Sequence, residues 1–378
     1  MSRVLIRTGA LRHNFRVIDD WMNRAGVSWT LVSKVLCGNR PVLELLYGLG
    51  VRSFGESRLE NIDEMPPLGD DAEIWYLRGP EASQVEQVVR HCAVSLNSEL
   101  TIIRELDACA GRLGKRHKIV IMIELGDLRE GVLPTHLTAF YEQVLALENV
   151  EVMGVGSNLG CMFGAIPSVE QMAQLSLYRE LLELKFGKKL PLISAGSTAA
   201  LPLLLDGQMP RTINHYRIGE ALFLGSDLSS GGSLPGLRTD AVEIEGRVLE
   251  VKEKSLFPMV PTGEDVSPFD NKPGDEVQPG QRGYRALVDI GNLDTDVQGL
   301  TPVESRFQIA GGSSDLLVLN VGSSRGALSI GDRVRFRPNY SALLRAMNSR
   351  YLSKHLDIRP PRHDPEQQAA PTATQPQA

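Results

Sequence analysis

Lys34 places a positive charge inside an apolar segment. Residues 29–36 read WTLVSKVL, which is the composition of a short buried strand, with Gly26 before it and Gly38 after it. Two interpretations are open. In one, the lysine lies at an edge and its ammonium reaches solvent; in the other, it is a desolvated amine. Burial lowers the pKa of a lysine and frees its lone pair for Schiff-base chemistry. The choice depends on which other residues the fold brings to Lys34.

Polar residues recur at the ends of the segments that resemble strands. They are Lys34, Glu56, Asn97, residues 127–129, Asn158, Ser197 and residues 217–220. Each of them alone is also compatible with a cap or a turn. If the strands are parallel, however, their carboxyl ends meet at one edge, where barrel enzymes build their active sites. The recurrence therefore favours a site over unrelated caps.

The elements that would position these residues alternate between strand and helix. Strand candidates are residues 29–36, 52–57, 73–79, 91–97, 118–125, 150–158, 191–197 and 215–224, and helical patterns lie between them, for example at 40–48, 83–91, 98–113 and 168–185. This alternation predicts parallel strands and an α/β fold, with a (β/α)8 barrel over residues 8–228. An open doubly wound sheet is the alternative. It is disfavoured because the glycines of residues 154–160 do not match GxGxxG.

After Gly225 the pattern changes to β-branched runs separated by glycine and proline. Such runs are AVEIEGRVLEV, YRALVDIGNLD, SDLLVLNVG and GDRVRFRP, and they indicate a smaller C-terminal β-domain. We assign residues 229–356 to it together with residues 1–7, because RVLIR at 3–7 reads as a strand that can join it. Residues 357–378 are rich in Pro, Gln and Ala and are expected to be disordered.

Composition excludes several classes of function. The net charge of −6 disfavours general binding to nucleic acid or anionic membranes. No apolar run has the length of a membrane span, and the start lacks the apolar core of a signal peptide. The four cysteines form no CxxC pair, which favours free thiols in the cytoplasm. There is no HExxH or GxxxxGK[ST] motif, and we expect no metal site.

Several motifs together resemble the fold-type III pyridoxal-phosphate enzymes, alanine racemase in particular. They are ALRHNFRV (10–17), the lysine of SKVLCGN, FGESRLE (54–60), GDLREG (126–131), SAGSTAA (194–200) and RIGE (217–220). The runs NLGCMFG, RIGEALFLG, SSDLLVLNV and NYSALLRAM are similar to the alanine/ornithine racemase branch of that family. The resemblance covers nearly the whole chain outside the tail.

The resemblance implies a role for each matching residue. Pyridoxal 5'-phosphate would be carried by Lys34, contacted by Asn158 and Arg217, and held at its phosphate by Ser197, Thr198, the amides near Gly219 and Glu220, and Tyr351. Arg129 would approach the substrate. An arginine facing the pyridine nitrogen offers no proton acceptor, so the nitrogen stays unprotonated, which favours racemisation over transamination.

The sequence departs from alanine racemase at three places. Gly38 stands where a tyrosine follows the cofactor lysine, Asn158 replaces the histidine that stacks on the ring, and Pro268 replaces the tyrosine that serves as second base. Racemisation needs an acid/base group on each face of the α-carbon. Lys34 can serve one face. The candidates for the other face are Asp294, Asp296, Asp315, Asp265 and Cys161.

We therefore predict a pyridoxal-phosphate racemase that interconverts L- and D-amino acids by two-base proton abstraction. Asp294 and Asp296 could also bind a distal ammonium, which favours ornithine or another cationic or polar substrate. We expect a homodimer in which the β-domain completes the partner's barrel. The alternatives are another fold-type III enzyme (alanine racemase, a D-amino-acid aldolase or dehydratase) and a non-catalytic protein that binds pyridoxal phosphate.

Overall fold

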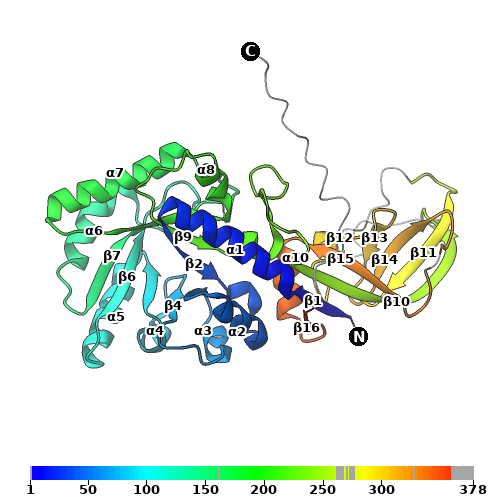
Figure 1. The fold of residues 1–378 in the computed structure, drawn as a ribbon, viewed down its shortest axis with the longest axis horizontal. Coiled ribbons are helices and arrows are strands. Elements are labelled where there is room, and N and C mark those ends of the chain that lie inside the picture. Colours follow the sequence, from blue (N-terminus) through cyan, green and yellow to red (C-terminus); the bar gives the residue numbers. More distant parts are fainter. Residues whose placement is uncertain are drawn as a thin grey trace, which may run out of the picture.

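The computed structural model describes residues 2–160, 162–260, 268–269, 271, 277–326 and 328–358. Two units lie side by side along the long axis of the molecule (Figure 1). A closed barrel with helices around it forms the larger unit, and an antiparallel sheet forms the smaller one.

Eight parallel strands close the barrel in sequence order. They are β2 (Ser28–Val32), β3 (Ser53–Glu56), β4 (Glu73–Tyr76), β5 (Val94–Asn97), β6 (His117–Met122), β7 (Val150–Gly156), β8 (Leu192–Ser197) and β9 (His215–Ile218). The circle closes where Ser28 pairs with His215 and Leu31 with Ile218. The predicted (β/α)8 barrel is confirmed.

Helices cover the outside of the barrel and bury apolar side chains against it. They are α1 (Thr8–Ala25), α2 (Arg40–Leu49), α3 (Leu59–Glu64), α4 (Val85–His91), α5 (Leu100–Arg112), α6 (Leu137–Val144), α7 (Val169–Phe186), α8 (Leu201–Leu205) and α9 (Glu220–Leu224), with short 3-10 turns η1 (Lys34–Leu36), η2 (Ala82–Gln84), η3 (Pro134–His136) and η4 (Thr198–Ala200). In α1 the buried side chains Leu11, Phe15, Ile18 and Met22 recur at helical spacing. Ser168 and Gln171 form a capping box at the start of α7.

All eight barrel strands are shorter than predicted, and the first and the eighth lose the most residues at their carboxyl ends. The first ends at Val32, because the chain turns into η1 and reaches a left-handed conformation at Cys37 (φ 49°). The eighth ends at Ile218. The residues after it, Glu220–Leu224, are helix formers and continue as α9 rather than as strand. In both places the difference lies at the carboxyl end of a strand.

The β-domain is an eight-stranded sheet in which the order β12-β15-β10-β11-β14-β13 is extended by β1 and β16. Its elements are β1 (Arg3–Arg7), β10 (Val242–Ser255), β11 (Arg282–Val288), η5 (Val297–Gly299), β12 (Leu300–Pro302), β13 (Gln308–Gly312), β14 (Leu317–Gly322), β15 (Arg333–Pro338), α10 (Tyr340–Asn348) and β16 (Ser353–Asp357). As predicted, residues 3–7 join it, antiparallel to β10 and parallel to β16.

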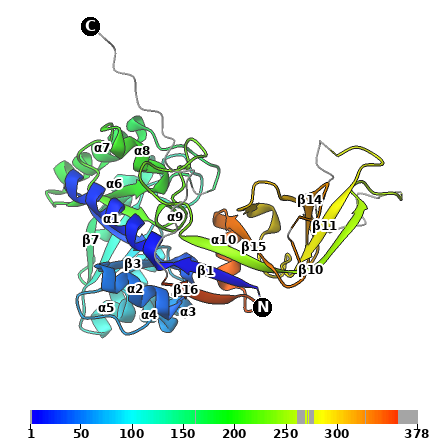
Figure 2. The same ribbon diagram turned by 45° about the vertical axis from the view of Figure 1, so that its right-hand side comes forward.

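One helix interrupts the region that we predicted as all-β. In α10, the side chain of Asn339 caps the first turn by accepting the amide of Ala342, and Ala342, Leu343, Ala346 and Met347 are buried. This helix packs against η1, so the β-domain touches the turn that begins at Lys34. Figure 2 shows α10 and β1 between the barrel and the far strands. The exact domain boundaries at residues 7/8 and 228/229 stay a prediction, and residues 359–378 of the predicted tail lie outside the described residues.

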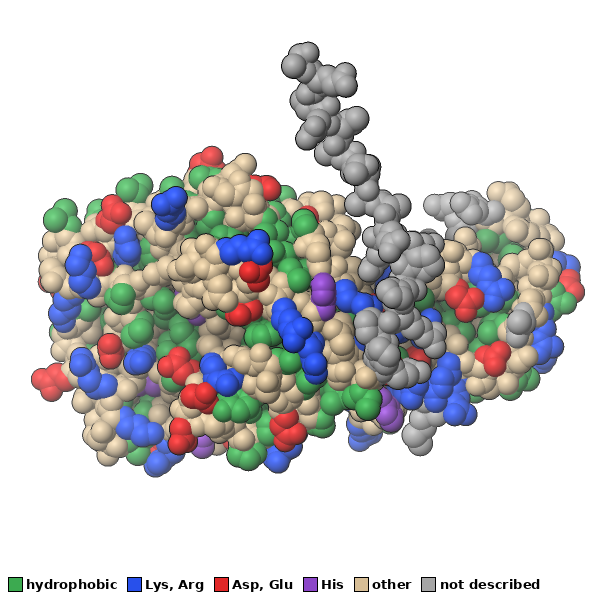
Figure 3. All heavy atoms as spheres, viewed as in Figure 1, with side chains coloured by type: hydrophobic (Ala, Val, Ile, Leu, Met, Phe, Trp, Pro, Cys, Tyr) green, Lys and Arg blue, Asp and Glu red, His purple; other side chains and the backbone are tan. Residues whose placement is uncertain are grey.

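No helix in the described ranges is both long enough and apolar enough to cross a membrane. On the face drawn in Figure 3, acidic and basic side chains are interspersed over the barrel.

Candidate active site

The barrel strands open into a cavity of about 250 Å³ at their carboxyl ends. Its wall contains the predicted residues Lys34, Arg129, Asn158, Ser197, Thr198, Arg217, Gly219 and Glu220, and in addition Val32, Leu77, Leu96, Leu159, Gly160, Ala199, Leu228 and Tyr340. Residues separated by almost two hundred positions in the sequence therefore meet at one place. The fold puts them there because parallel strands in a closed barrel end on the same side.

Lys34 is half-buried and begins η1, one residue after the end of strand β2. Next to its turn lies Glu56, which is fully buried at the end of β3. The Glu56 carboxylate accepts hydrogen bonds from Ser33 Oγ (3.0 Å), Asn61 Nδ2 (3.1 Å) and the amide of Ser57 (3.3 Å). Burial raises the pKa of Glu56, while its hydrogen bonds and the charge of Lys34 act in the opposite direction. The surroundings of Lys34 are those of a partly enclosed amine rather than of an exposed lysine.

Ser197 and Thr198 form a polar corner of the cavity where β8 ends. The Ser197 hydroxyl is buried and has no hydrogen-bond partner among the described residues. Thr198 Oγ1 accepts the amide of Ala221 at 3.2 Å. At Gly219 a Cβ atom would lie 3.0 Å from Val32, so glycine leaves this wall open. A buried hydroxyl without a partner costs free energy unless a ligand accepts its proton, and an anion such as a phosphate would do so.

Arg217 is 6% exposed, and its guanidinium is held by four oxygen atoms. Nη1 donates to the Ser194 carbonyl and to Ser194 Oγ, both at 2.5 Å. Nη2 donates to the Ser157 carbonyl at 2.7 Å and to Asn158 Oδ1 at 2.6 Å. A buried charge with this many partners is fixed in place rather than mobile.

Glu130 extends this network from Arg217 to Arg129. Asn158 accepts from Arg217 and donates through Nδ2 to Glu130, whose carboxylate also accepts from Arg129 Nε and, at 2.6 Å, from Arg129 Nη2. The four side chains form one continuous chain of hydrogen bonds. Our sequence reasoning missed Glu130. The only available signal was its place beside Arg129 in a motif that we had already singled out.

The predicted phosphate ligand Tyr351 does not line the cavity. Its ring is 52% exposed, lies next to the Arg350 guanidinium, and its hydroxyl accepts from Arg350 Nη2 at 2.9 Å. Tyr340 lines the cavity instead. The capped start of α10 places Tyr340 at the first helical position and carries Tyr351 beyond the end of the helix. Tertiary packing of α10 thus gives the two tyrosines, eleven positions apart, different surroundings, and the role of Tyr351 at the phosphate stays a prediction.

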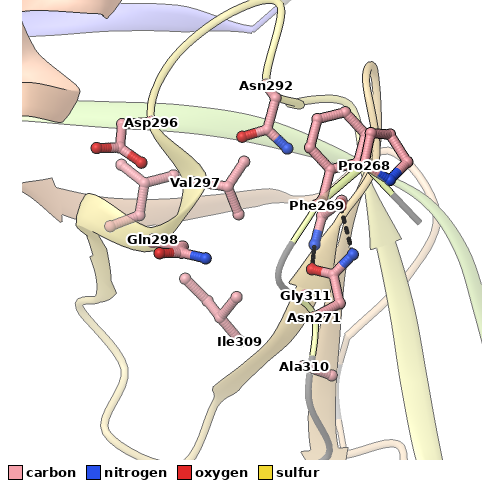
Figure 4. Close-up of a pocket in the computed structure, with 12 residues that line it drawn as sticks. Pro268, Phe269, Asn271, Asn292, Asp296, Val297, Gln298, Ile309, Ala310 and Gly311 are labelled. Carbon is pink, nitrogen blue, oxygen red and sulfur yellow. Dashed lines mark hydrogen bonds between the residues drawn. The ribbon is translucent and has the colours of Figure 1, made fainter. Parts of the chain in front are cut away.

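The three predicted acids of the β-domain do not reach the barrel cavity in the described chain. Asp296 lines a separate cavity of about 540 Å³ in the β-domain. Figure 4 shows it with Gln298 on one side of this cavity and Phe269 and Asn271 on the other. Asp296 accepts Ser341 Oγ at 2.7 Å.

Asp294 and Asp315 do not line the cavity of Asp296. Asp294 accepts the amide of Gly291 at 2.9 Å, and burial raises its pKa. Asp315 is exposed and accepts Ser313 Oγ at 3.2 Å. Pro268 belongs to the same cavity as Asp296. The remaining candidates for the second base, Asp265 and Cys161, lie outside the described residues.

Comparisons with known proteins show the family and the fold to which this chain is similar. The family model of the alanine racemase N-terminal domain matches residues 6–227. An ornithine racemase of Acetoanaerobium sticklandii is 33% identical over 355 residues, which cover 94% of this chain and 99% of that protein. A lysine racemase of Thermotoga maritima is 34% identical over 352 residues, which cover 93% and 97%. The solved alanine racemase of Bartonella henselae, with covalently bound pyridoxal phosphate, has a TM-score of 0.70 at 16% identity and covers 94% of this chain and 99% of its own.

Proposed function

This chain belongs to the alanine racemase family, and from this premise we propose that it is a pyridoxal-phosphate-dependent racemase of amino acids with a basic side chain, ornithine above all. Racemases of ornithine and of lysine match it over nearly their full length. The observation that carries the proposal is the meeting of Lys34, Ser197 and Arg217 in one cavity. An amine, a buried hydroxyl without a partner and a fixed guanidinium suit an aldehyde-bearing phosphate ester.

The residues present fit this cofactor. Lys34 would bind the aldehyde of the cofactor, and Ser197 and Thr198 would bind its phosphate. Arg217 would contact the pyridine ring. As a further phosphate ligand we propose Tyr340, which lines the cavity, in place of Tyr351. When bound, pyridoxal phosphate supplies the electron sink that makes the α-hydrogen of an amino acid acidic. The protein has to orient the amino acid, exclude water and move protons.

Lys34 Nζ would remove or return the proton at the α-carbon on one face. Arg129, steadied by Glu130, would bind the substrate carboxylate through charge-assisted hydrogen bonds. The opposite face needs a second acid/base group with a pKa near working pH. Among the described residues that line the barrel cavity, the one carboxyl group is that of Glu220, and burial raises its pKa. We assign the second group to the β-domain of a partner subunit.

A head-to-tail homodimer in the cytoplasm is the second element of the proposal. Its support is that Asp296 lies in the β-domain cavity and not in the barrel cavity of its own chain. The described cysteines Cys37, Cys92 and Cys109 are free, as expected in a reducing compartment. Lys34→Ala subunits lack the proton-transfer group, and Asp296→Asn subunits should turn over ornithine more slowly. Mixed and refolded together, they should racemise ornithine faster than either variant alone. A monomer in ultracentrifugation, with no rescue on mixing, would contradict the dimer.

The cofactor assignment has a direct test. Purified protein should absorb as a pyridoxal-phosphate enzyme, and borohydride should fix the cofactor to the peptide that contains Lys34. Labelling of another lysine would refute the role of Lys34. Racemisation of ornithine, lysine, alanine and serine should then be followed by chiral chromatography. Equal turnover of alanine and ornithine would refute the basic-substrate assignment while leaving the cofactor assignment intact.

A further inference from the structure

A row of polar side chains runs from Arg217 into the barrel interior. Ser194 Oγ, which accepts from Arg217, lies 2.8 Å from His215 Nδ1. His215 Nε2 lies 3.0 Å from Thr30 Oγ1, and Thr30 Oγ1 lies 2.7 Å from Ser53 Oγ. The row crosses three adjacent strands of the barrel and then reaches a fourth: β8, β9, β2 and β3. Barrel interiors are usually filled with branched apolar side chains, so this row needs a reason.

The direction of each hydrogen bond in this row follows from the donor-only character of Arg217 and from the requirement that buried polar groups have partners. An arginine can only donate, so Ser194 Oγ accepts from Arg217. If the Ser194 hydroxyl is to be satisfied as a donor, its proton must go to His215 Nδ1. The imidazole then carries its proton on Nε2 and donates it to Thr30, which in turn donates to Ser53. Any other arrangement leaves a buried polar hydrogen or lone pair without a partner, which costs free energy.

His215 is built to remain in this state. It is 3% exposed, and the ring of Trp75 stacks on it with centroids 4.5 Å apart and planes 11° apart. Burial, assisted by the positive charge of Arg217, lowers the pKa of His215 to about 3. A proton on Nδ1 would point at Ser194 Oγ and displace the donor role of that hydroxyl.

We propose that His215 is a positioning residue: as the neutral imidazole protonated on Nε2, it orients the Ser194 hydroxyl and through it fixes Arg217 at the cavity wall. His215 itself does not line the cavity. The part of the inference that concerns the cofactor rests on the proposed function, whereas the hydrogen-bond order does not.

The hydrogen-bond order is tested first on the cofactor-free wild-type protein. Nitrogen-15 NMR of the imidazole rings at neutral pH distinguishes a protonated Nε2 from a protonated Nδ1, and His215→Gln identifies the resonance. We expect His215 as the Nε2–H tautomer. A proton on Nδ1, or a charged ring, would overturn the inference whatever reaction the protein catalyses.

The positioning role is tested by His215→Phe, which keeps a ring against Trp75 but removes the acceptor. We expect cofactor affinity and kcat each to fall about tenfold, since a hydrogen bond in a charged network is lost, with a shifted absorbance maximum of the bound cofactor and little change in KM. His215→Gln can accept from Ser194 and donate to Thr30, so it should stay within about threefold of wild type.

The matched control is His117→Phe. His117 is buried like His215 and bonds to Ser95 Oγ at 2.8 Å, but that pair does not reach Arg217. It should match His215→Phe in lost folding stability and leave the cofactor spectrum and affinity at wild-type values. Equal cofactor affinity in His215→Phe and His117→Phe would overturn the positioning role. Should His215→Phe fail to fold, Ser194→Ala breaks the same link, and an unchanged affinity and spectrum there would also overturn it. Absence of racemase activity in wild type, with the tautomer as expected, would instead refute the proposed function alone.

Discussion

The two cavities of this molecule differ in how their polar residues are held. In the barrel cavity of about 250 Å³, Arg217, Asn158, Glu130 and Arg129 form one continuous network. In the β-domain cavity of about 540 Å³, Asp296 is the acid that lines the wall, with Ser341 as its hydrogen-bond partner. The smaller cavity holds several charged side chains fixed by hydrogen bonds, whereas the described lining of the larger one contains a single charged side chain, that of Asp296.

This difference follows from topology. Parallel barrel strands end at one rim, so residues at strand ends are brought together. The β-domain has no such common rim, and even the two acids of the loop between β11 and η5 separate. Asp294 and Asp296 are two positions apart, yet they line different cavities. The barrel is therefore expected to carry the common chemistry, and the β-domain the choice of substrate.

Replacing Lys34 should have the largest effect, because it removes the proton-transfer group of the barrel. Lys34→Ala should lower kcat for racemisation by at least about 10³-fold, within the range expected for a positioned acid/base group that also attaches the cofactor. Chiral chromatography of ornithine gives the rate. Circular dichroism should show an unchanged fold, and retention of more than a tenth of the wild-type rate would contradict the assignment.

Asp296→Asn should change selectivity rather than chemistry. Loss of a charge-assisted hydrogen bond to a distal ammonium should lower kcat/KM for ornithine relative to alanine by about ten- to a hundredfold. Asp315→Asn is the matched control, because Asp315 is exposed and outside that cavity. If Asp296→Asn loses racemisation of alanine as well as of ornithine, with the cofactor still bound, Asp296 is the second acid/base group instead. An unchanged ranking of substrates would contradict a role of Asp296 in recognising the substrate side chain.

Acid should destabilise the barrel through its two buried histidines. Burial lowers the pKa of His215 to about 3 and of His117 to about 4, below the ordinary value of 6.5. Below pH 6.5 these two histidines are therefore protonated in the unfolded chain but neutral in the folded chain. The free energy of unfolding decreases as the pH falls toward the two folded-state pKa values. Linkage gives a loss of about 2 kcal/mol for each histidine between pH 8 and pH 5. Glu56 has a raised pKa and works in the opposite direction.

Urea unfolding at pH 8 and pH 5 measures this loss in the barrel itself, because Trp21, Trp29 and Trp75 all lie in that unit and report its unfolding by fluorescence. The pH dependence should flatten in His117→Phe and in His215→Phe. An identical slope in wild type and both variants would show that these imidazoles are not held neutral.

Glu130→Gln should have the smallest effect. The pair with Arg129 is partly exposed, at 35% and 28% of the side chains, so solvent weakens it. We expect KM for all amino acids to rise about two- to fivefold through a less ordered Arg129, with no change in the ranking of substrates. Glu124→Gln, which perturbs the turn before Arg129, is the control for loop disorder. A change in the ranking of substrates would show that Glu130, in the barrel, contributes to substrate selectivity.

The barrel could be predicted from the residue pattern, and so could several of the side chains that line its cavity. Strand-helix alternation predicted eight parallel strands, and polar residues at their ends predicted which side chains would share a cavity. Lys34, Asn158, Ser197 and Arg217 do share it. This worked because the periodicity of a buried strand and the common rim of a parallel barrel are both local consequences of the sequence pattern.

Other features of the site depend on contacts between residues that are far apart in the chain. Tyr340, at the start of α10, lines the cavity, whereas Tyr351, beyond the end of that helix, does not. Glu130 and His215 acquire their roles only through partners far away in the chain, Asn158 for the first and Ser194 and Thr30 for the second. A hydrogen bond between strands depends on the distance and angle between its atoms, and the spacing of residues along one strand does not predict either.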